Sequence, residues 1–240
     1  PLVVFGFFVL SSYVLIYIKN QYLKYIFFVL IFIVALSTGH DSTYLALALI
    51  CFSYVFLHCN LKYKLFMITG LILLAVGVFV FVPSFSDVNM QWRLLFWKDS
   101  FMRIINNYFI LGEGFGIQYA SDDTIIQLNN LFPDSTNAPL ILGDNKYLSA
   151  PHNSFITMML HLGIISILLL FYPLKSLFKN NILIMDKDIL FLSLSLLGFV
   201  VFSSFNVILE LPHTSSIFWI VFFALIFKLT EKSGLPTNEQ

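Results

Sequence analysis

Charged residues are scarce in this sequence, and cysteine is nearly absent. Only 11% of the 240 residues are charged and 59% are hydrophobic, whereas a soluble domain carries about 25% charged residues. This composition excludes an ordinary soluble globular protein. The only two cysteines are Cys51 and Cys59, and the long polar segment of the chain holds no further one. A structural disulfide or a cysteine metal site is therefore not expected.

The formal net charge of the chain is zero. The charge total thus gives no overall attraction to nucleic acid or to acidic lipid, and the placement of the charges matters more. No internal repeat of fixed period and no low-complexity tract is visible. We expect no nucleic-acid partner, no metal and no other cofactor.

Long apolar runs occupy most of the chain. A helix needs about 17–25 apolar residues to cross the ~30 Å hydrocarbon layer, and it satisfies its own backbone groups there. We predict an all-α integral membrane protein with about seven transmembrane helices, at Leu2–Ile18, Tyr22–Leu36, Tyr44–Leu57, Leu65–Val82, Ser154–Tyr172, Ile189–Leu209 and Ile217–Leu229. For the shorter second, third and seventh runs, a full span is preferred over a re-entrant turn. Because the chain begins Pro-Leu-Val, we expect further sequence before it.

The lysines indicate the orientation of these spans. They gather in three short connectors and near the C-terminal end, as Lys19, Lys24, Lys62, Lys64, Lys175, Lys179, Lys187, Lys228 and Lys232. With seven spans, all of them fall on one side, which we assign to the cytoplasm because cytoplasmic loops are rich in Lys and Arg. The long polar loop then faces the periplasm or the exterior. The predicted organisation is four spans in 1–82, the outer functional loop in 83–153, three spans in 154–229 and a cytoplasmic tail in 230–240.

The outer loop divides into a helix and a coil. Met90–Ile105 is strongly apolar but carries four charged residues, which predicts an amphipathic helix over 90–105 at the membrane surface or across the mouth of the bundle. Asn106–Pro151 is rich in Gly, Pro, Asn and Asp, which predicts irregular coil with short turns. Residues 118–150 show no pattern to which we assign a chemistry.

Both arginines of the chain, Arg93 and Arg103, fall in this predicted helix. Their placement opposes the inward bias of basic residues, and a guanidinium offers a planar set of donors that suits phosphate oxygens. A pyrophosphate held at the membrane surface is the ligand that this pattern favours. For Arg103 a local alternative stays open, because Asp99 lies four residues before it in the order that favours a helix ion pair.

Three alternating glycines follow in Leu111-Gly-Glu-Gly-Phe-Gly116. Glycine lets the backbone approach a ligand closely, but the Lys-Ser/Thr ending of a phosphate-binding P-loop is missing. On this pattern alone, a flexible turn leaving the helix is the preferred interpretation.

Pro151-His152-Asn153 closes the loop directly before the fifth span. Imidazole titrates near neutral pH, so His152 can take a proton from a sugar hydroxyl as that oxygen attacks. On position alone, the preferred interpretation is a histidine that caps the next helix together with Asn153 and Ser154.

Taken together, these residues resemble the O-antigen ligase and O-antigen polymerase family of bacterial envelope polysaccharide synthesis. One matching pattern contains Trp92 and Arg103, with Gly114 after a gap of ten residues. The other is His152-Asn153, then nine residues, then Gly163-Ile-Ile-Ser166. Both occur in order around one long outer loop, and the resemblance covers most of the chain.

The resemblance implies a metal-independent, inverting membrane glycosyltransferase of the GT-C type in the bacterial inner membrane, acting in lipopolysaccharide or other surface polysaccharide synthesis. Its donor would be a glycan on undecaprenyl pyrophosphate. Its acceptor would be a second lipid-linked glycan for a polymerase, which we favour, or lipid A core for a ligase. The lipid bilayer and a chain-length regulator are candidate partners.

The resemblance also implies roles for single residues. Arg93 and Arg103 would hold and neutralise the departing pyrophosphate. His152 would orient or deprotonate the acceptor hydroxyl. Gly114 and Gly116 would let the loop close over the phosphates.

Four further residues are substrate-binding candidates. Trp92 and Asn153 belong to the two matching patterns. Many family members have Ser-Arg-Gly between the second and third spans, whereas this turn holds His40 and Asp41. The substitution puts a third phosphate-binding arginine in doubt and makes His40 and Asp41 candidates instead.

Two other classes of function stay open. A polysaccharide or lipid-linked oligosaccharide transporter or flippase would line a path through the bundle with charged residues, but the predicted spans carry few of them and no inverted repeat is evident. A non-catalytic membrane scaffold would explain the loop but not two arginines placed against the charge bias.

Overall fold

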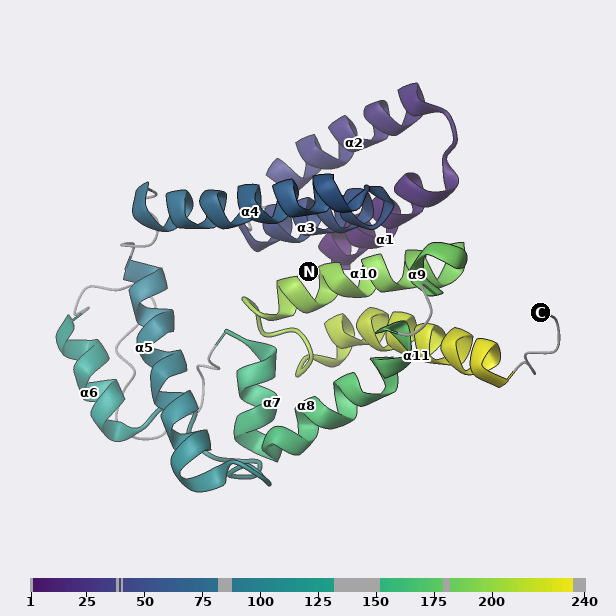
Figure 1. The fold of residues 1–240 in the computed structure, drawn as a ribbon. Helices are drawn as coiled ribbons and strands as arrows, with labels where there is room; N and C mark the ends of the chain where they lie inside the picture. The colour runs from purple at the N-terminus through teal and green to yellow at the C-terminus, as the bar shows by residue number, and fades with distance from the viewer. Residues whose placement is uncertain are drawn as a thin grey trace. The chain divides into compact units, whose positions relative to one another are not determined.

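The computed structural model describes residues 2–37, 39, 41–81, 88–131, 152–178 and 182–234, and within these ranges the chain is helical without strands (Figure 1). It divides into two compact units. Unit 1 comprises Pro1–Lys64 and Phe171–Gln240, and unit 2 comprises Leu65–Leu170. The all-α fold class predicted from the sequence is confirmed for the described residues.

Unit 1 contains α1 (Leu2–Tyr17), α2 (Gln21–Leu36), α3 (Asp41–His58), a 3-10 helix (Tyr172–Phe178), α9 (Ile182–Met185), α10 (Lys187–Ser203) and α11 (Pro212–Gly234). α4 (Leu61–Phe81) lies mostly in unit 2, as does α8 (Ile164–Phe171). Unit 2 also contains α5 (Val88–Arg103), a π-helix (Ile104–Tyr108), α6 (Asp122–Leu131) and α7 (Ser154–Leu162).

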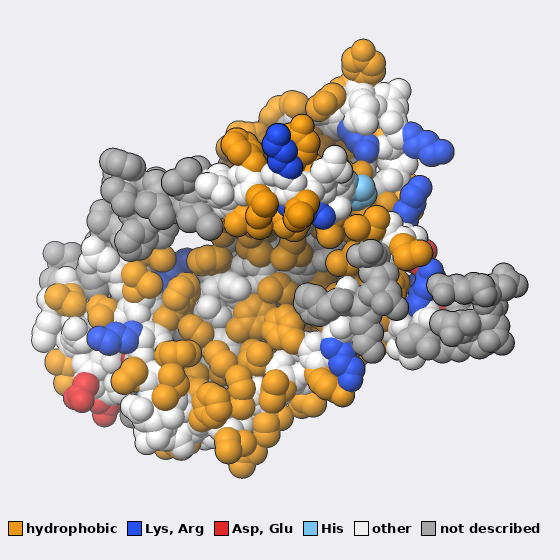
Figure 2. Space-filling view, in the orientation of Figure 1, with side chains coloured by type: hydrophobic (Ala, Val, Ile, Leu, Met, Phe, Trp, Pro, Cys, Tyr) orange, Lys and Arg blue, Asp and Glu red, His pale blue; other side chains and the backbone are white. Residues whose placement is uncertain are grey.

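Helices lie at all seven apolar runs that were predicted to span the membrane. Two of the described helical segments, Asp41–His58 and Thr214–Lys232, are long and apolar enough to cross, and a bent pair of helices adds a third if it counts as one span. Figure 2 shows hydrophobic side chains spread over much of the described surface on its visible face. These findings fit a membrane protein, while the count of seven spans and the side of the long loop stay predictions.

Aromatic packing around α10 holds unit 1 together. Phe199 of α10 contacts Phe5 and Phe8 of α1, with ring centroids 4.7 and 5.9 Å apart, and α10 also packs on α3 and α11. Gly198 permits this close approach, because a Cβ there would lie 2.8 Å from Ile50 Cδ1 and from Phe8 Cγ. Small residues at contacts of this kind let membrane helices pack closely.

A helix lies at the predicted range 90–105, as α5 followed by the π-helix, while its amphipathic, interfacial character stays a prediction. α6 packs on α5 through a small apolar core. The buried members of this core are Trp92, Phe96, Ala120, Ile125 and Leu128. α5 is therefore fixed along one side by a second helix that the sequence analysis did not predict.

The prediction of coil over Asn106–Pro151 is wrong at α6. Ser121 stands directly before α6, and its hydroxyl accepts a hydrogen bond from the Thr124 N–H at 3.3 Å, as a helix-capping residue does. The Asp99 carboxylate of α5 in turn accepts bonds from the Ser121 N–H and hydroxyl, at 2.9 and 2.7 Å. Residues 132–151 of the predicted coil lie outside the described residues.

The fifth predicted span, Ser154–Tyr172, does not form one continuous helix. It breaks at Gly163, where φ is +67°, and the helical segments on either side are bent by 119°. Figure 1 shows α7 and α8 meeting in a V. At about 1.5 Å per residue, α7 is roughly 14 Å long, less than half of the ~30 Å hydrocarbon layer. A straight crossing by this run is therefore excluded.

Candidate functional site

Seven of the nine site residues predicted from the sequence lie in unit 2. They are Trp92, Arg93, Arg103, Gly114, Gly116, His152 and Asn153. Asp41 is an exposed residue at the start of α3 in unit 1, and His40 lies outside the described residues. The site is therefore described from unit 2 alone.

Trp92, Arg93 and His152 form one group, the His152 cluster. α5 packs on α7, and the rings of Trp92 and His152 meet edge to face, with centroids 6.0 Å apart and planes at 73°. Burial of the imidazole, and in second place the positive charge of Arg93, lower the pKa of His152 below its ordinary value. Both effects disfavour the imidazolium form. His152 is thus held neutral at neutral pH, as a proton acceptor must be.

The backbone at His152 is unusual. Its φ of +52° lies in the left-handed region, which costs a non-glycine residue about 1–3 kcal/mol. The Asn153 side-chain oxygen accepts hydrogen bonds from the N–H groups of Phe155 and Ile156, at 3.0 and 3.1 Å. The capping interpretation is therefore confirmed for Asn153. His152 precedes the cap, and its ring instead contacts Trp92.

Arg103 is the centre of a second group, the Arg103 cluster, with Asp99, Glu113 and Gln118. Its guanidinium pairs with the Glu113 carboxylate, donates to the Gln118 carbonyl oxygen at 3.0 Å and lies 3.9 Å from the Asp99 carboxylate. The helix ion pair considered for Arg103 is confirmed. The closer partner, Glu113, was not predicted.

The two arginines occupy separate positions along α5. They are ten residues apart, and the rise of an α-helix separates their backbones by about 15 Å along its axis. Arg93 acts electrostatically on His152, and no ion pair joins it to another side chain within the described ranges. The guanidinium of Arg103 already has partners. A ligand that contacts both arginines must therefore be extended along α5.

The segment after α5, Ile105–Gly116, forms what we call the wide turn. Its three glycines, Gly112, Gly114 and Gly116, have φ values of +72°, +95° and +81°, a region that favours glycine. A Cβ on Gly114 or Gly116 would meet nothing within 4 Å. These two positions thus leave space beside the backbone, as the predicted role in phosphate binding requires, and that role stays a prediction.

The wide turn docks on the break between α7 and α8. Three backbone hydrogen bonds join them: Glu113 N–H to Leu160 O (2.7 Å), Gly114 N–H to His161 O (3.1 Å) and Ile164 N–H to Phe109 O (2.8 Å). The last carbonyls and first N–H groups of a helix lack partners within the helix. The wide turn therefore supplies partners for both helix ends at the break.

Gly112 and Gly163 make this docking sterically possible. A Cβ on Gly112 would lie 2.5 Å from the Gly163 nitrogen, and a Cβ on Gly163 would lie 2.6 Å from the Gly112 nitrogen. Two backbones meet here with no room for a side chain. Gly163 belongs to a pattern noted in the sequence, and this contact gives its physical reason.

His161 is a site residue that the sequence analysis did not select. Its Nδ1 lies 2.7 Å from the Gly114 carbonyl oxygen. Because a carbonyl only accepts, Nδ1 carries the proton and donates it. The ring stacks on Phe115, with centroids 4.9 Å apart and planes at 12°. His161 thus fixes the middle of the glycine-rich stretch, and its position two residues before Gly163 is the signal that could have identified it.

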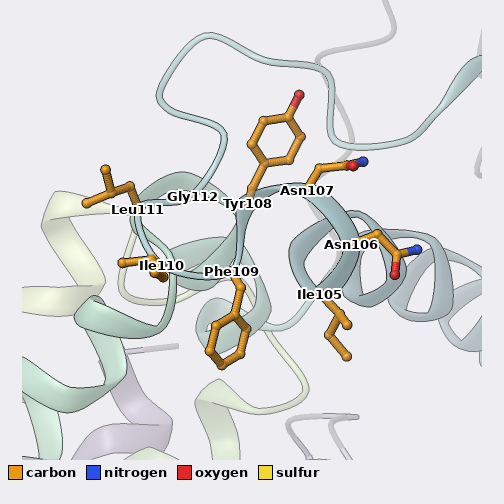
Figure 3. Close-up of a pocket in the computed structure, with 8 residues that line it drawn as sticks. All are labelled: Ile105, Asn106, Asn107, Tyr108, Phe109, Ile110, Leu111 and Gly112. Atoms are coloured by element: carbon orange, nitrogen blue, oxygen red, sulfur yellow. The ribbon is translucent and has the colours of Figure 1, made fainter.

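The wide turn lines an open hollow of about 470 Å³ with Ile105–Gly112 (Figure 3). The hollow begins at the π-helix, a form often found at functional sites. None of its lining residues is charged. The hollow itself therefore offers no cation for a phosphate, and the charged groups of the site are those of the two clusters.

Among the described residues, no three His, Cys, Asp or Glu side chains are grouped as metal ligands. Comparison with protein-family models matches residues 26–171 to a family described as O-antigen ligase. The match runs from α2 to the end of α8 and includes both clusters and the wide turn. No curated protein and no solved structure matches the chain.

Proposed function

The chain belongs to the O-antigen ligase family, and from this membership we propose that it is a glycosyltransferase that joins an undecaprenyl-pyrophosphate-linked glycan to an acceptor sugar. The general role, of the O-antigen ligase or polymerase type at a bacterial membrane, follows from the family and the apolar helices. The donor, the acceptor and the residue roles below belong to the proposal, as do the inner membrane and a periplasmic loop.

The His152 cluster is the observation that supports this reaction. In the proposed step, an acceptor hydroxyl oxygen attacks the anomeric carbon of the donor from the face opposite the pyrophosphate. The new carbon–oxygen bond forms as the bond to the pyrophosphate oxygen breaks, and the hydroxyl proton passes to His152. A neutral imidazole can accept this proton, and both burial and Arg93 keep His152 neutral.

The departing undecaprenyl pyrophosphate carries negative charge that needs a cation nearby. We assign Arg93 to this charge, because it lies beside His152 and forms no ion pair within the described ranges. Arg103 would contact the donor from the other end of the site, through the wide turn that it holds. Gly114 and Gly116 leave the backbone open toward the phosphates.

The proposal predicts that His152→Asn abolishes polysaccharide synthesis. Asn tolerates the left-handed backbone of this position but cannot accept the proton, so the rate of glycan transfer should fall at least about 100-fold. The measurement is surface polysaccharide on gels from a deletion strain that expresses the variant. His58→Ala, at an exposed position in unit 1, is the matched control. Normal polysaccharide with His152→Asn at wild-type protein level would refute the proposal.

Polymerase and ligase differ in their acceptor, and we favour the polymerase. A deletion strain of a polymerase leaves single repeat units on lipopolysaccharide. A deletion strain of a ligase instead accumulates long chains on the lipid carrier. Gel analysis of lipopolysaccharide together with mass spectrometry of the lipid carrier separates the two.

The proposal also predicts how activity depends on pH. Activity requires neutral His152, so it should fall as the pH drops through the lowered pKa of His152, below the ordinary value of about 6.5. Arg93→Gln removes one of the two effects that lower this pKa, so the acidic limb of the residual activity should move to higher pH. Arg93→Lys keeps the charge and should leave the acidic limb at the same pH. The measurement is polymer formation in membrane vesicles between about pH 5 and 8. If the wild type, Arg93→Gln and Arg93→Lys all lose activity at the same acidic pH, the assignment of His152 as base is contradicted.

A further inference from the structure

The wide turn exposes an unusual amount of apolar surface. Its exposed large apolar side chains are Ile105, Tyr108, Phe109, Ile110, Leu111 and Phe115. Leu111 is 73% exposed and Phe115 is 76% exposed. Several large apolar side chains exposed within one segment favour a contact with protein or membrane, so a partner other than water is expected here.

The charge pattern of the turn indicates which partner. Residues 104–112 carry no charge, and Arg103 and Glu113, which flank them, pair with each other. Paired charges are the form in which ionisable groups enter a low-dielectric layer. Most of the turn is therefore uncharged, and its one charged residue, Glu113, is paired with Arg103.

The docking of the turn fixes it beside α8. The Ile164 N–H at the start of α8 donates to the Phe109 carbonyl oxygen at 2.8 Å, and Gly112 meets Gly163 backbone to backbone. α8 has no charged residue, and its Leu169 is 70% exposed. Because these contacts join backbones, the turn and the start of α8 must lie at the same depth in a membrane.

Ile110 and Leu111 form the apolar side of the turn. Figure 3 shows them at the left and the amides of Asn106 and Asn107 at the right, with Ile105 beside Asn106. This division lets the apolar side face hydrocarbon while the amides face polar surroundings.

We infer that the wide turn enters the hydrocarbon layer beside α8, and that lipid chains cover its apolar side. The sequence pattern predicted an outer polar coil from Asn106 onward; in this inference the segment lies at membrane depth instead, because it docks on the break at Gly163. The paired charges of the Arg103 cluster then lie near the boundary between hydrocarbon and headgroups. The inference does not rest on the proposed glycosyl transfer.

Spin-label accessibility in reconstituted vesicles tests the inference. The whole chain, with Cys51 and Cys59 replaced by serine, receives a single nitroxide through Leu111→Cys, or through Ile110→Cys should the first variant fail to insert. Leu169→Cys in α8 is the hydrocarbon reference, and Gln127→Cys, exposed on α6, is the aqueous reference. Vesicles of phosphatidylcholine and phosphatidylglycerol are probed with oxygen, which concentrates in hydrocarbon, and with a water-soluble nickel chelate.

The label at position 111 is expected to be more accessible to oxygen than to the nickel chelate, as at position 169. At position 127 the opposite order is expected. Nickel accessibility equal to that at position 127 would place the turn in water and overturn the inference. A label shielded from both reagents would show that protein covers the turn, which also overturns it. Since no outcome depends on catalysis, the inference and the proposed function fail separately.

Discussion

Gly163→Ala is expected to abolish polysaccharide synthesis by undocking the wide turn from the α7–α8 break. At Gly163 φ is +67° and ψ is −166°, a backbone region that is essentially restricted to glycine, so alanine there costs about 1–3 kcal/mol. The new Cβ would also lie 2.6 Å from the Gly112 nitrogen and overlap the Ile110 carbonyl. Overpacking adds about 1–3 kcal/mol, and backbone atoms cannot move aside as a flexible side chain can.

The loss should spread beyond position 163. The three backbone hydrogen bonds between the wide turn and the break form only if the backbones approach closely, and at the buried Leu160 an unmade bond is costly. The measurements are surface polysaccharide in a complemented deletion strain and the melting temperature of the purified protein in detergent.

Two further glycine variants distinguish the cost of the backbone conformation from the cost of steric overlap. Gly116→Ala faces open space at a φ of +81°, so it should show only the 1–2 kcal/mol backbone cost. Gly70→Ala lies within α4 with open space around it and should not destabilise a helix, because alanine is the better helix former. Equal melting temperatures for Gly163→Ala and Gly116→Ala would show that the backbone contact at Gly163 contributes nothing.

The break at Gly163 could not be predicted from the sequence. The apolar runs predicted the positions of the helices well, because burial in lipid needs only apolar composition. Ser154–Tyr172 is as apolar as the other runs, and membrane helices often contain glycine. The bend depends instead on a backbone about fifty residues earlier, and no local pattern reports that contact.

α6 was missed for a different reason. Ser121 at the cap position and the one-turn spacing of Ile125 and Leu128 are helix signals, but the surrounding Asp, Asn and Gln residues favoured coil. Its stability comes from tertiary contacts, namely the Asp99 carboxylate at its cap and the aromatic side chains of α5.

The candidate site was predicted in part. Spacing alone indicated the Asp99–Arg103 pair as one of two alternatives for Arg103, because both residues lie on one helix. The meeting of Trp92, Arg93 and His152 could be expected only from the family resemblance, since about sixty residues separate these groups. The Arg103–Glu113 pair had no signal, because its spacing fits no helix and depends on the shape of the wide turn.

Arg103→Leu is expected to destabilise unit 2 and to abolish polysaccharide synthesis. The variant leaves Glu113 without its partner at a position where both side chains are mostly buried, and an uncompensated charge of this kind costs about 3–5 kcal/mol. The double variant Arg103→Leu with Glu113→Leu removes both charges, and such replacements are often neutral. Its melting temperature should therefore return toward that of the wild type.

Stability and activity should separate in the double variant. If Arg103 contacts the donor, the double variant recovers its melting temperature but makes no polymer, because no cation remains at that end of the site. Polymer synthesis by the double variant would show that Arg103 only holds the wide turn in place and does not belong to the proposed donor site. Glu231→Leu breaks an exposed pair with Lys228, 3.3 Å apart in unit 1, and serves as the matched control with an expected cost of about 0–1 kcal/mol.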